Sequence, residues 1–241
     1  MDIHKPKPWR GVREFLKEYA IIVVGVLTAL GAEAVVQNVH EARLSAEARQ
    51  AVRDELNLDI TNLALRFTRD ICVNRRLDEI DALLDRAEAG GSFAPPGAVA
   101  RPRDRAIYAE RWETAKSGGR LSLISSDDQR AFVRAYLPLG YVIERQREEL
   151  QVWLRLQALQ GRRRLSPDMI TVQRLAVAQA RGLDAEIHRD FTQAQFFAAK
   201  VGVKGDARLQ IPTAEAAATV NPVICQPLGA LPPNSNSPVR G

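Results

Sequence analysis

The chain has 241 residues, of which 46% are hydrophobic and 26% charged, so it can form a folded domain with its own core and is too apolar for a disordered protein. Aromatic residues make up only 6%, which favours aliphatic helix packing over a strand-rich fold. The net charge of +5 comes from arginines scattered among acids, unlike the concentrated basic face of a nucleic-acid-binding protein. We therefore expect no nucleic-acid partner.

The first strong signal is an apolar segment preceded by a basic lead. Residues 19–39 read YAIIVVGVLTALGAEAVVQNV and carry one charge, at Glu33. A helix of this length matches a hydrocarbon core about 30 Å thick, so the pattern predicts a transmembrane helix with the lipid bilayer as its partner. The excess of positive charge in residues 1–18 favours a cytoplasmic N-terminus, an inner-membrane location and an exported, periplasmic C-terminal part.

Three other interpretations of this segment remain open. A cleavable signal peptide would use Ala32-Glu33-Ala34 as its cleavage site, although the leader is long and partly acidic. A buried helix of a soluble protein is the second, because the uncharged core spans only residues 19–32. A helix lying in the membrane interface is the third, although the run has no polar face. The length of the run favours the spanning helix.

Two features inside the span are candidate contact sites. Four small residues fall at helical spacing and form one stripe on which another helix can pack, which suggests a homo-oligomer or another membrane protein as partner; they are Gly25, Thr28, Ala29 and Ala32. Small residues are also common in membrane helices by chance. Glu33 is a candidate intramembrane polar site, or an acid that a small shift of the helix places at the interface.

Residues 40–205 show helical periodicity throughout and predict a helical bundle domain. Apolar positions at steps of three and four describe one long stalk helix: Leu44, Ala48, Val52, Leu56, Ile60, Leu63, Phe67 and Ile71. A bend is expected near Cys72, and the pattern then continues to about Ala89 and ends at Gly90-Gly91.

A loop that contains Pro and Gly is expected from Gly90-Gly91 through Pro102, and three further helices are expected after it. The first is short, is capped by Asp104 and holds Ile107, Tyr108, Trp112 and Ala115. The second is capped by Ser126 or Asp127. The third begins at Ser166-Pro167, carries Ile170, Leu175, Leu183, Ile187, Phe191, Ala194 and Ala198, and stops before Gly202.

Residues 206–241 change in character and form a Pro-rich tail that we expect to be partly disordered. Its apolar stretch around Val220 to Leu228, which includes Cys225, is suited to docking on the bundle. Cys72 and Cys225 are the two cysteines of the chain. In an oxidising compartment we expect a disulfide between them, and in a reducing one two buried thiols.

Catalytic, cofactor and metal signatures are absent from the sequence, so we expect no enzymatic activity, no cofactor and no metal. Glu186, His188 and Asp190 are the nearest approach to a metal cluster, but residues two apart on a helix point away from each other. Trp112 and Trp153 are candidates for lining a ligand pocket. Their spacing among aliphatic residues favours the alternative that both are core residues.

Three segments resemble a group of uncharacterised bacterial single-pass membrane proteins. The most specific is Trp9 to Leu30, W-R-x-x-x-E-F-L-K-E-Y-x-I-I-V-V-G-V-L-T-A-L; the others are Cys72 to Ile80 and Trp112 to Ile124. They cover roughly a third of the chain. The resemblance implies an anchor helix and a helical domain. It implies no activity and assigns no functional residue.

These patterns predict an all-α fold in which a membrane helix continues into a long stalk and packs with further helices as an antiparallel bundle. The expected function is that of a membrane-anchored interaction or scaffold protein that associates with itself. The alternative is an extracytoplasmic, sensor-like bundle that binds a small ligand and signals through a partner.

Overall fold

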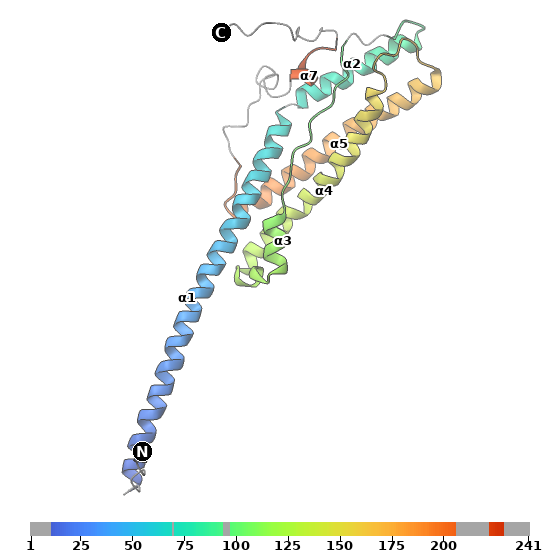
Figure 1. Ribbon diagram of the computed structural model, residues 1–241. Helices are drawn as coiled ribbons and strands as arrows, with labels where there is room; N and C mark the ends of the chain where they lie inside the picture. Colours follow the sequence, from blue (N-terminus) through green and yellow to red (C-terminus); the bar gives the residue numbers. More distant parts are fainter. Residues whose placement is uncertain (1–10, 69, 94–96, 206–221, 229–241) are drawn as a thin grey trace, which may run out of the picture.

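The computed structural model describes residues 11–68, 70–93, 97–205 and 222–228, which Figure 1 shows as ribbons. Most of the basic lead and most of the Pro-rich tail lie outside these residues. The described residues form helices and no strand, which confirms the predicted all-α fold. The bundle occupies one end of the molecule, and the N-terminal half of α1 extends away from it (Figure 1).

Helix α1 (Val12–Phe67) is one continuous helix of 56 residues with two different environments. Up to Arg43 its residues are exposed, apart from partly covered Val23. Beyond that point one face packs into the bundle through Ala48, Val52, Leu56, Ile60 and Leu63, as the periodicity predicts. The predicted continuation from apolar segment to stalk is therefore confirmed.

Helix α2 (Asp70–Glu88) follows after a short joint, and the predicted bend lies slightly before Cys72. The joint changes the phase of the helix, so Ile71, expected on the buried stripe, is 58% exposed and that prediction is wrong. Ile80 and Leu84 are fully buried on the inward face of α2. The helix ends just before the Gly90-Gly91 pair, as predicted.

Helices α4 (Ser126–Gln157) and α5 (Pro167–Lys200) form a long hairpin. Arg145 pairs with Glu186, and Arg155 binds Gln179, so the helices run antiparallel. Ser166 caps α5 as predicted, because its side chain accepts a hydrogen bond from the Met169 N–H.

Two details of this hairpin differ from expectation. The cap of α4 is Ser125, which accepts a hydrogen bond from the Asp128 N–H, rather than Ser126 or Asp127. Leu175, expected on the inward face of α5, is 58% exposed. Leu183 is partly buried against the core, and the other apolar residues expected on this face of α5 are buried.

Contacts to α1 fix the direction of the hairpin in the bundle. Tyr136 of α4 binds Glu55 of α1, and Glu149 of α4 binds Arg66 of α1. Residue numbers therefore increase in the same direction along both helices, which are parallel. Arg53 binds the Gly202 carbonyl and Arg66 binds Asp184, so α5 is antiparallel to α1. The bundle therefore contains the expected antiparallel packing, and α4 is parallel to the stalk.

The short helix α3 (Glu110–Ser117) and the 3-10 helix η1 (Arg120–Leu123) pack against α1 at the end of the bundle nearest the extended half of α1 (Figure 1). The expected cap at Asp104 is wrong, because α3 begins six residues later and Ile107 and Tyr108 precede it. Gly119 turns the chain between α3 and η1 with a positive φ of 68°, which a residue without a side chain adopts easily.

The core consists of two apolar clusters along the bundle. The first joins the second half of α1 with α3 and with the facing ends of α4 and α5, and includes Leu56, Trp112, Phe132 and Phe191. The second joins α2 with the other ends of α4 and α5, and includes Leu77 and Trp153. The short helix α7 (Pro222–Cys225) adds Ile224 and Cys225 to this second cluster. The predicted docking of this segment is confirmed for the described residues 222–228.

Candidate functional site

The apolar segment of α1 has no protein covering. Among the described residues α1 is the one helix long and apolar enough to cross a membrane: an 18-residue window has a mean hydropathy of 2.1, and none of it is buried. Ile21, Ile22, Leu27 and Val36 each expose more than 60% of their surface. An isolated apolar surface of this size is unfavourable in water and is stable in lipid or against a partner.

The small-residue stripe lies on this exposed part of α1. A side chain added at Gly25 would meet no other atom within 4 Å, so no described element packs against the stripe. Thr28 satisfies its hydroxyl locally by donating to the Val24 carbonyl, at 2.7 Å. Ala29, Ala32 and Glu33 are also exposed. The roles predicted for the stripe and for Glu33 stay predictions.

The two tryptophans predicted to line one pocket lie in different core clusters. Trp153 is fully buried in the cluster around α2, and Trp112 is 5% exposed in the cluster around α1. Of the two, Trp112 lines a groove of about 570 Å³ between α3, α4 and the segment before α3, and Trp153 does not line this groove. The structure therefore places a candidate binding surface at Trp112 alone.

Aromatic rings form the floor of this groove and an apolar row forms its outer wall. The rings of Trp112 and Tyr136 stack with centroids 4.9 Å apart and planes 4° apart. Val133, Leu137 and Tyr141 follow one another at successive turns of α4, and 50%, 56% and 44% of their respective surfaces are exposed. Exposed apolar residues in such a row are typical of surfaces that receive an apolar partner.

Charged side chains lie at the rim of the groove. Lys116 is 5.5 Å above the Trp112 ring and pairs with Glu113 at 2.7 Å. Glu144 is also a lining residue, and in the described structure it forms no ion pair. The groove therefore offers an apolar floor with a carboxylate at its edge, which suits an apolar group or helix that carries a positive charge.

Two buried acids of α1 hold the groove's floor in place. Glu55 accepts hydrogen bonds from the Arg111 and Trp112 N–H groups, at 2.7 and 3.1 Å, and from the Tyr136 hydroxyl at 2.8 Å. The carboxylate thus caps the N-terminus of α3 from another helix. Burial and the nearby Glu55 carboxylate raise the pKa of Tyr136, so the phenol stays protonated and donates to Glu55.

Asp59, one turn further along α1, accepts a hydrogen bond from the Tyr108 N–H at 2.8 Å. Its side chain is fully buried. Burial is the main cause that raises the pKa of Asp59 from 3.8 to about 8, and the neighbouring Glu55 and Glu110 act in the same direction. Asp59 is therefore predominantly protonated at neutral pH, where it fixes the segment that leads into α3.

A second buried charge network lies at the joint between α1 and α2. Arg66 is 3% exposed and binds Glu149 at 2.8 Å and Asp184 at 3.1 Å, which ties α1 to α4 and α5. Burial, and then the charge of Asp184, raise the pKa of Asp70 to about 8, although Arg66 opposes this shift. His188 lies 3.7 Å from Asp70. Removing Arg66 would leave Glu149 and Asp184 buried without an opposing charge.

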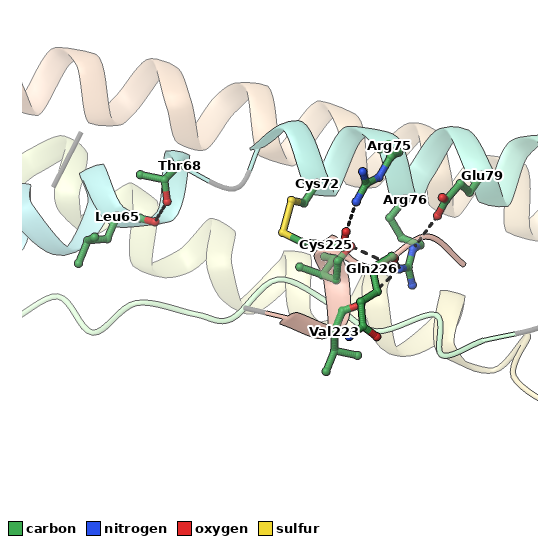
Figure 2. The surroundings of a disulfide bond; sticks show 10 residues. Leu65, Thr68, Cys72, Arg75, Arg76, Glu79, Val223, Cys225 and Gln226 are labelled. Carbon is green, nitrogen blue, oxygen red and sulfur yellow. Dashed lines mark hydrogen bonds and ion pairs between the residues drawn. A yellow bond between two sulfur atoms is a disulfide. The ribbon is translucent and has the colours of Figure 1, made fainter. Parts of the chain in front are cut away.

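The cysteine pair links the start of α2 to the short helix α7. The sulfur atoms of Cys72 and Cys225 are 2.07 Å apart, which is a disulfide and confirms the predicted pairing. As Figure 2 shows, Arg75 and Arg76 of α2 reach the same C-terminal segment. Arg75 donates to the Cys225 carbonyl, and Arg76 donates to the carbonyls of Ala98, Val99, Val223, Ile224 and Gln226. The segment 222–228 is thus fixed by a covalent bond and by buried hydrogen bonds.

The weak metal cluster suggested by the sequence is an ion-pair network instead. Arg145 of α4 pairs with Glu186 at 2.8 Å and with Asp190 at 2.6 Å, while His188 faces Asp70. Across the described ranges, no three His, Cys, Asp or Glu side chains gather as metal ligands would.

Sequence reasoning missed the groove and both buried charge networks. Asp59 and Arg66 are seven residues apart on α1, so they lie on one face and alternate with Ile60 and Leu63. Charges at inward positions of an apolar stripe were the available signal. Comparison with known proteins finds no matching family model, no matching curated protein and no matching solved structure.

Proposed function

We propose that this protein is a membrane-anchored helical interaction protein, which crosses the bacterial inner membrane once and holds its bundle in the periplasm. The observation that carries the proposal is the apolar segment within residues 19–39, which is long enough to span and has no protein covering. The basic lead before this segment supports a cytoplasmic N-terminus. A disulfide in the bundle supports an oxidising compartment for the domain.

The surface that binds a partner is the groove at Trp112. Its exposed row of Val133, Leu137 and Tyr141 is preformed, because the floor beneath it is fixed by Glu55 and Asp59. A preformed apolar surface binds a partner without the entropic cost of first ordering itself. This favours a role as a docking platform held at a set distance from the membrane.

Self-association through the small-residue stripe is the second part of the proposal. Gly25, Thr28, Ala29 and Ala32 allow close backbone approach between two copies within the bilayer, where packing rather than hydrophobicity drives helix association. Parallel copies anchored in one membrane would present their bundles side by side.

The membrane anchor is tested by placing charge at its centre. We expect the wild-type chain to stay with membranes through an alkaline carbonate wash. The double variant Val24→Arg/Leu27→Arg should be released, because a central arginine costs about 2.5–3.5 kcal/mol on insertion scales. The control is Leu58→Arg, which places the same charge at an exposed apolar site on the bundle half of α1. Retention of the span variant would rule out the anchor.

Self-association is tested in the same membrane system by in-membrane cross-linking. Gly25→Ile and Ala29→Ile should weaken the cross-linked dimer, because both add bulk on the stripe. Leu27→Ile is the matched control, since position 27 lies on the opposite face of the helix. An equal loss in all three variants, or in none, would refute this role of the stripe.

A second function, binding of a small ligand by a sensor-like bundle, is favoured by the volume of the groove. About 570 Å³ is within the usual range of small-molecule sites. Thermal-shift screening of the detergent-solubilised protein with metabolites tests this function, with Leu137→Trp, which fills the groove, as the control. A shift that persists in Leu137→Trp would place the ligand elsewhere.

A further inference from the structure

The end of the bundle that holds η1 lies close to the end of the proposed membrane span. Ser45 donates a hydrogen bond to the Leu123 carbonyl, and Arg49 pairs with Asp128 at 2.7 Å, so η1 and the start of α4 are level with residues 45–49 of α1. Helix α1 is unbroken over this range. Ser45 is six positions after Val39, which corresponds to about 9 Å at 1.5 Å per residue.

The outer edge of the lipid headgroups lies just below this height. A bilayer is about 40–45 Å thick with a hydrocarbon core of about 30 Å, so each headgroup layer is about 5–7.5 Å deep. The segment 117–126, which contains η1, therefore lies at the outer surface of the headgroup layer, within reach of an arginine side chain, if residues 19–39 span. We refer to residues 117–126 as the η1 end; Figure 1 shows this end as the part of the bundle nearest the extended half of α1.

Two exposed arginines at this height are free to bind phosphate. Three further cations near η1 are already paired: Arg49 with Asp128, Lys116 with Glu113, and Arg130 with Asp127. In the described structure Arg43 and Arg120 form no ion pair, and both are exposed. A guanidinium binds a phosphate through two parallel hydrogen bonds, which makes arginine suited to phospholipid headgroups.

We propose that the η1 end rests on the lipid headgroups, with Arg43 and Arg120 bound to phospholipid phosphates. Arg43 holds the stalk on the side away from η1, and Arg120 holds the bundle. Glu41 and Glu47 lie on neighbouring turns of α1, so the net charge at this height is small. The contact thus depends on the height fixed by α1 and on individual arginine–phosphate pairs. The inference rests on the proposed transmembrane span.

Depth measurement with the full chain separates this inference from the span itself. Fluorophores are attached to one added cysteine at a time, at Leu30, Ser126 or Arg162, while the native disulfide stays closed. The vesicles contain phosphatidylcholine and phosphatidylglycerol, with a nitroxide quencher on the headgroup or in the acyl chain. Helix α4 has 32 residues and is about 48 Å long, so Arg162, beyond its far end, is the reference for solvent.

We expect the acyl-chain nitroxide to quench the label at Leu30, and the headgroup nitroxide to quench Ser126 several times more strongly than Arg162. Quenching at Leu30 with equal quenching at Ser126 and Arg162 would overturn the headgroup contact and leave the span standing. Absence of quenching at Leu30 would overturn the span, and the inference with it.

An insertion in α1 tests whether the stalk sets this height. Seven helix-forming residues placed after Val39 raise the bundle by about 10.5 Å and rotate it by only about 20°, since seven residues are nearly two turns. The headgroup quenching of Ser126 should then fall to the level of Arg162, while quenching at Leu30 is unchanged. Persistent quenching of Ser126 would contradict a contact fixed by α1.

The arginine contacts have their own readout. Quenching of Ser126 by a nitroxide on phosphatidylglycerol, relative to one on phosphatidylcholine, should fall in the variant Arg43→Gln/Arg120→Gln. Each near-surface arginine enriches anionic lipid by roughly fivefold at most. Arg162→Gln, at the far end of the bundle, is the control and should leave the ratio unchanged. An unchanged ratio in the double variant would remove the two arginines from the proposal.

Discussion

At the scale of single residues, buried carboxylates decide where α3 lies. A helix of eight residues is too short to form alone, and the α3 sequence supplies no side-chain cap. Glu55 meets this need from α1 by accepting two backbone N–H groups at the start of α3 and the Tyr136 hydroxyl. One side chain thus joins α1, α3 and α4 beneath the groove.

Replacing Glu55 by Gln should loosen the groove. The amide keeps the shape but loses the negative charge, and its NH₂ group faces donors instead of accepting from them. We expect a loss of about 1–3 kcal/mol in the free energy of unfolding, with increased exposure of Trp112 to a fluorescence quencher. Glu47→Gln, an exposed substitution on the same helix, is the control. Equal stability of the two variants would contradict the capping role.

Asp59 predicts how stability depends on pH. Its pKa is about 8 in the folded protein and near 3.8 in the unfolded chain, so the folded state binds the extra proton between these values. The contribution of Asp59 to stability is therefore greatest below pH 4, falls as the pH rises, and levels off above pH 8, with a slope of about 1.4 kcal/mol per pH unit for one proton. Asp70, whose pKa is also about 8, steepens the decline.

Asp59→Asn should flatten this decline, because the amide does not titrate. Urea unfolding of the detergent-solubilised protein at pH 5, 6, 7 and 8 measures the slope. Asp54→Asn changes an exposed acid five residues away on the same helix and should leave the wild-type slope intact. A slope in Asp59→Asn as steep as in the wild type would show that Asp59 keeps an ordinary pKa.

At the scale of elements, the segment 222–228 depends on its attachments rather than on its own structure. Helix α7 has four residues and lies 153 positions from Cys72, its covalent partner. Arg76 is 1% exposed and binds carbonyls from the loop before α3 and from this segment, so its charge is buried among backbone acceptors and Glu79. The disulfide and Arg76 act on the same element from adjacent turns of α2.

Removing the disulfide should free this element before the rest of the bundle unfolds. We expect Cys72→Ser/Cys225→Ser to cost about 2–5 kcal/mol in the free energy of unfolding. Amide hydrogen exchange should increase at residues 223–228 and in α2, while α1 and the start of α4 stay protected. Reduction of the wild type is the matched experiment and should give the same pattern. Uniform loss of protection in all helices would contradict a local role for the bond.

Periodicity predicted most elements, and tertiary contacts explain where it failed. The buried faces of α1 and α5 follow the apolar steps, and Ser166-Pro167 marks the start of α5, because these signals are local. The start of α3 was misplaced because its cap is Glu55, which is distant in sequence. Ile71 was assigned to the core by extending the periodicity of α1 past residue 67. It is exposed because α2 begins with a different helical phase, which periodicity alone does not reveal.

The candidate site was predicted only in part, for a related reason. Trp112 and Trp153 lie in different apolar clusters, and helical spacing does not show which of the two borders a groove. The disulfide was foreseen because the chain has two cysteines and therefore one intramolecular pairing. Val133, Leu137 and Tyr141 escaped notice because α4 alternates exposed and buried apolar residues at almost every turn.

At the scale of the whole molecule, two features constrain the orientation in the membrane. The exposed apolar half of α1 and the disulfide-linked bundle belong to one continuous helix–bundle unit, so the bundle lies on one side of the bilayer if residues 19–39 span. Disulfides persist in the periplasm and are reduced in the cytosol. The pairing of Cys72 with Cys225 therefore favours the same orientation as the basic lead.

The orientation can be measured in living cells by combining a reporter with thiol labelling. A reporter enzyme that is active only outside the cytoplasm, fused after Gly241, should be active, because in the proposed orientation the C-terminal part follows the bundle into the periplasm. Cys72 and Cys225 should react with a maleimide only after reduction and unfolding, because both are paired and at most 6% exposed. A single-cysteine variant, Cys225→Ser, controls for burial, since its Cys72 should react on unfolding without reduction.

A silent reporter together with thiols that react on unfolding alone would reverse the orientation. The groove, Arg43 and Arg120 would then face the cytoplasm, where the inner leaflet and cytosolic proteins would be their partners.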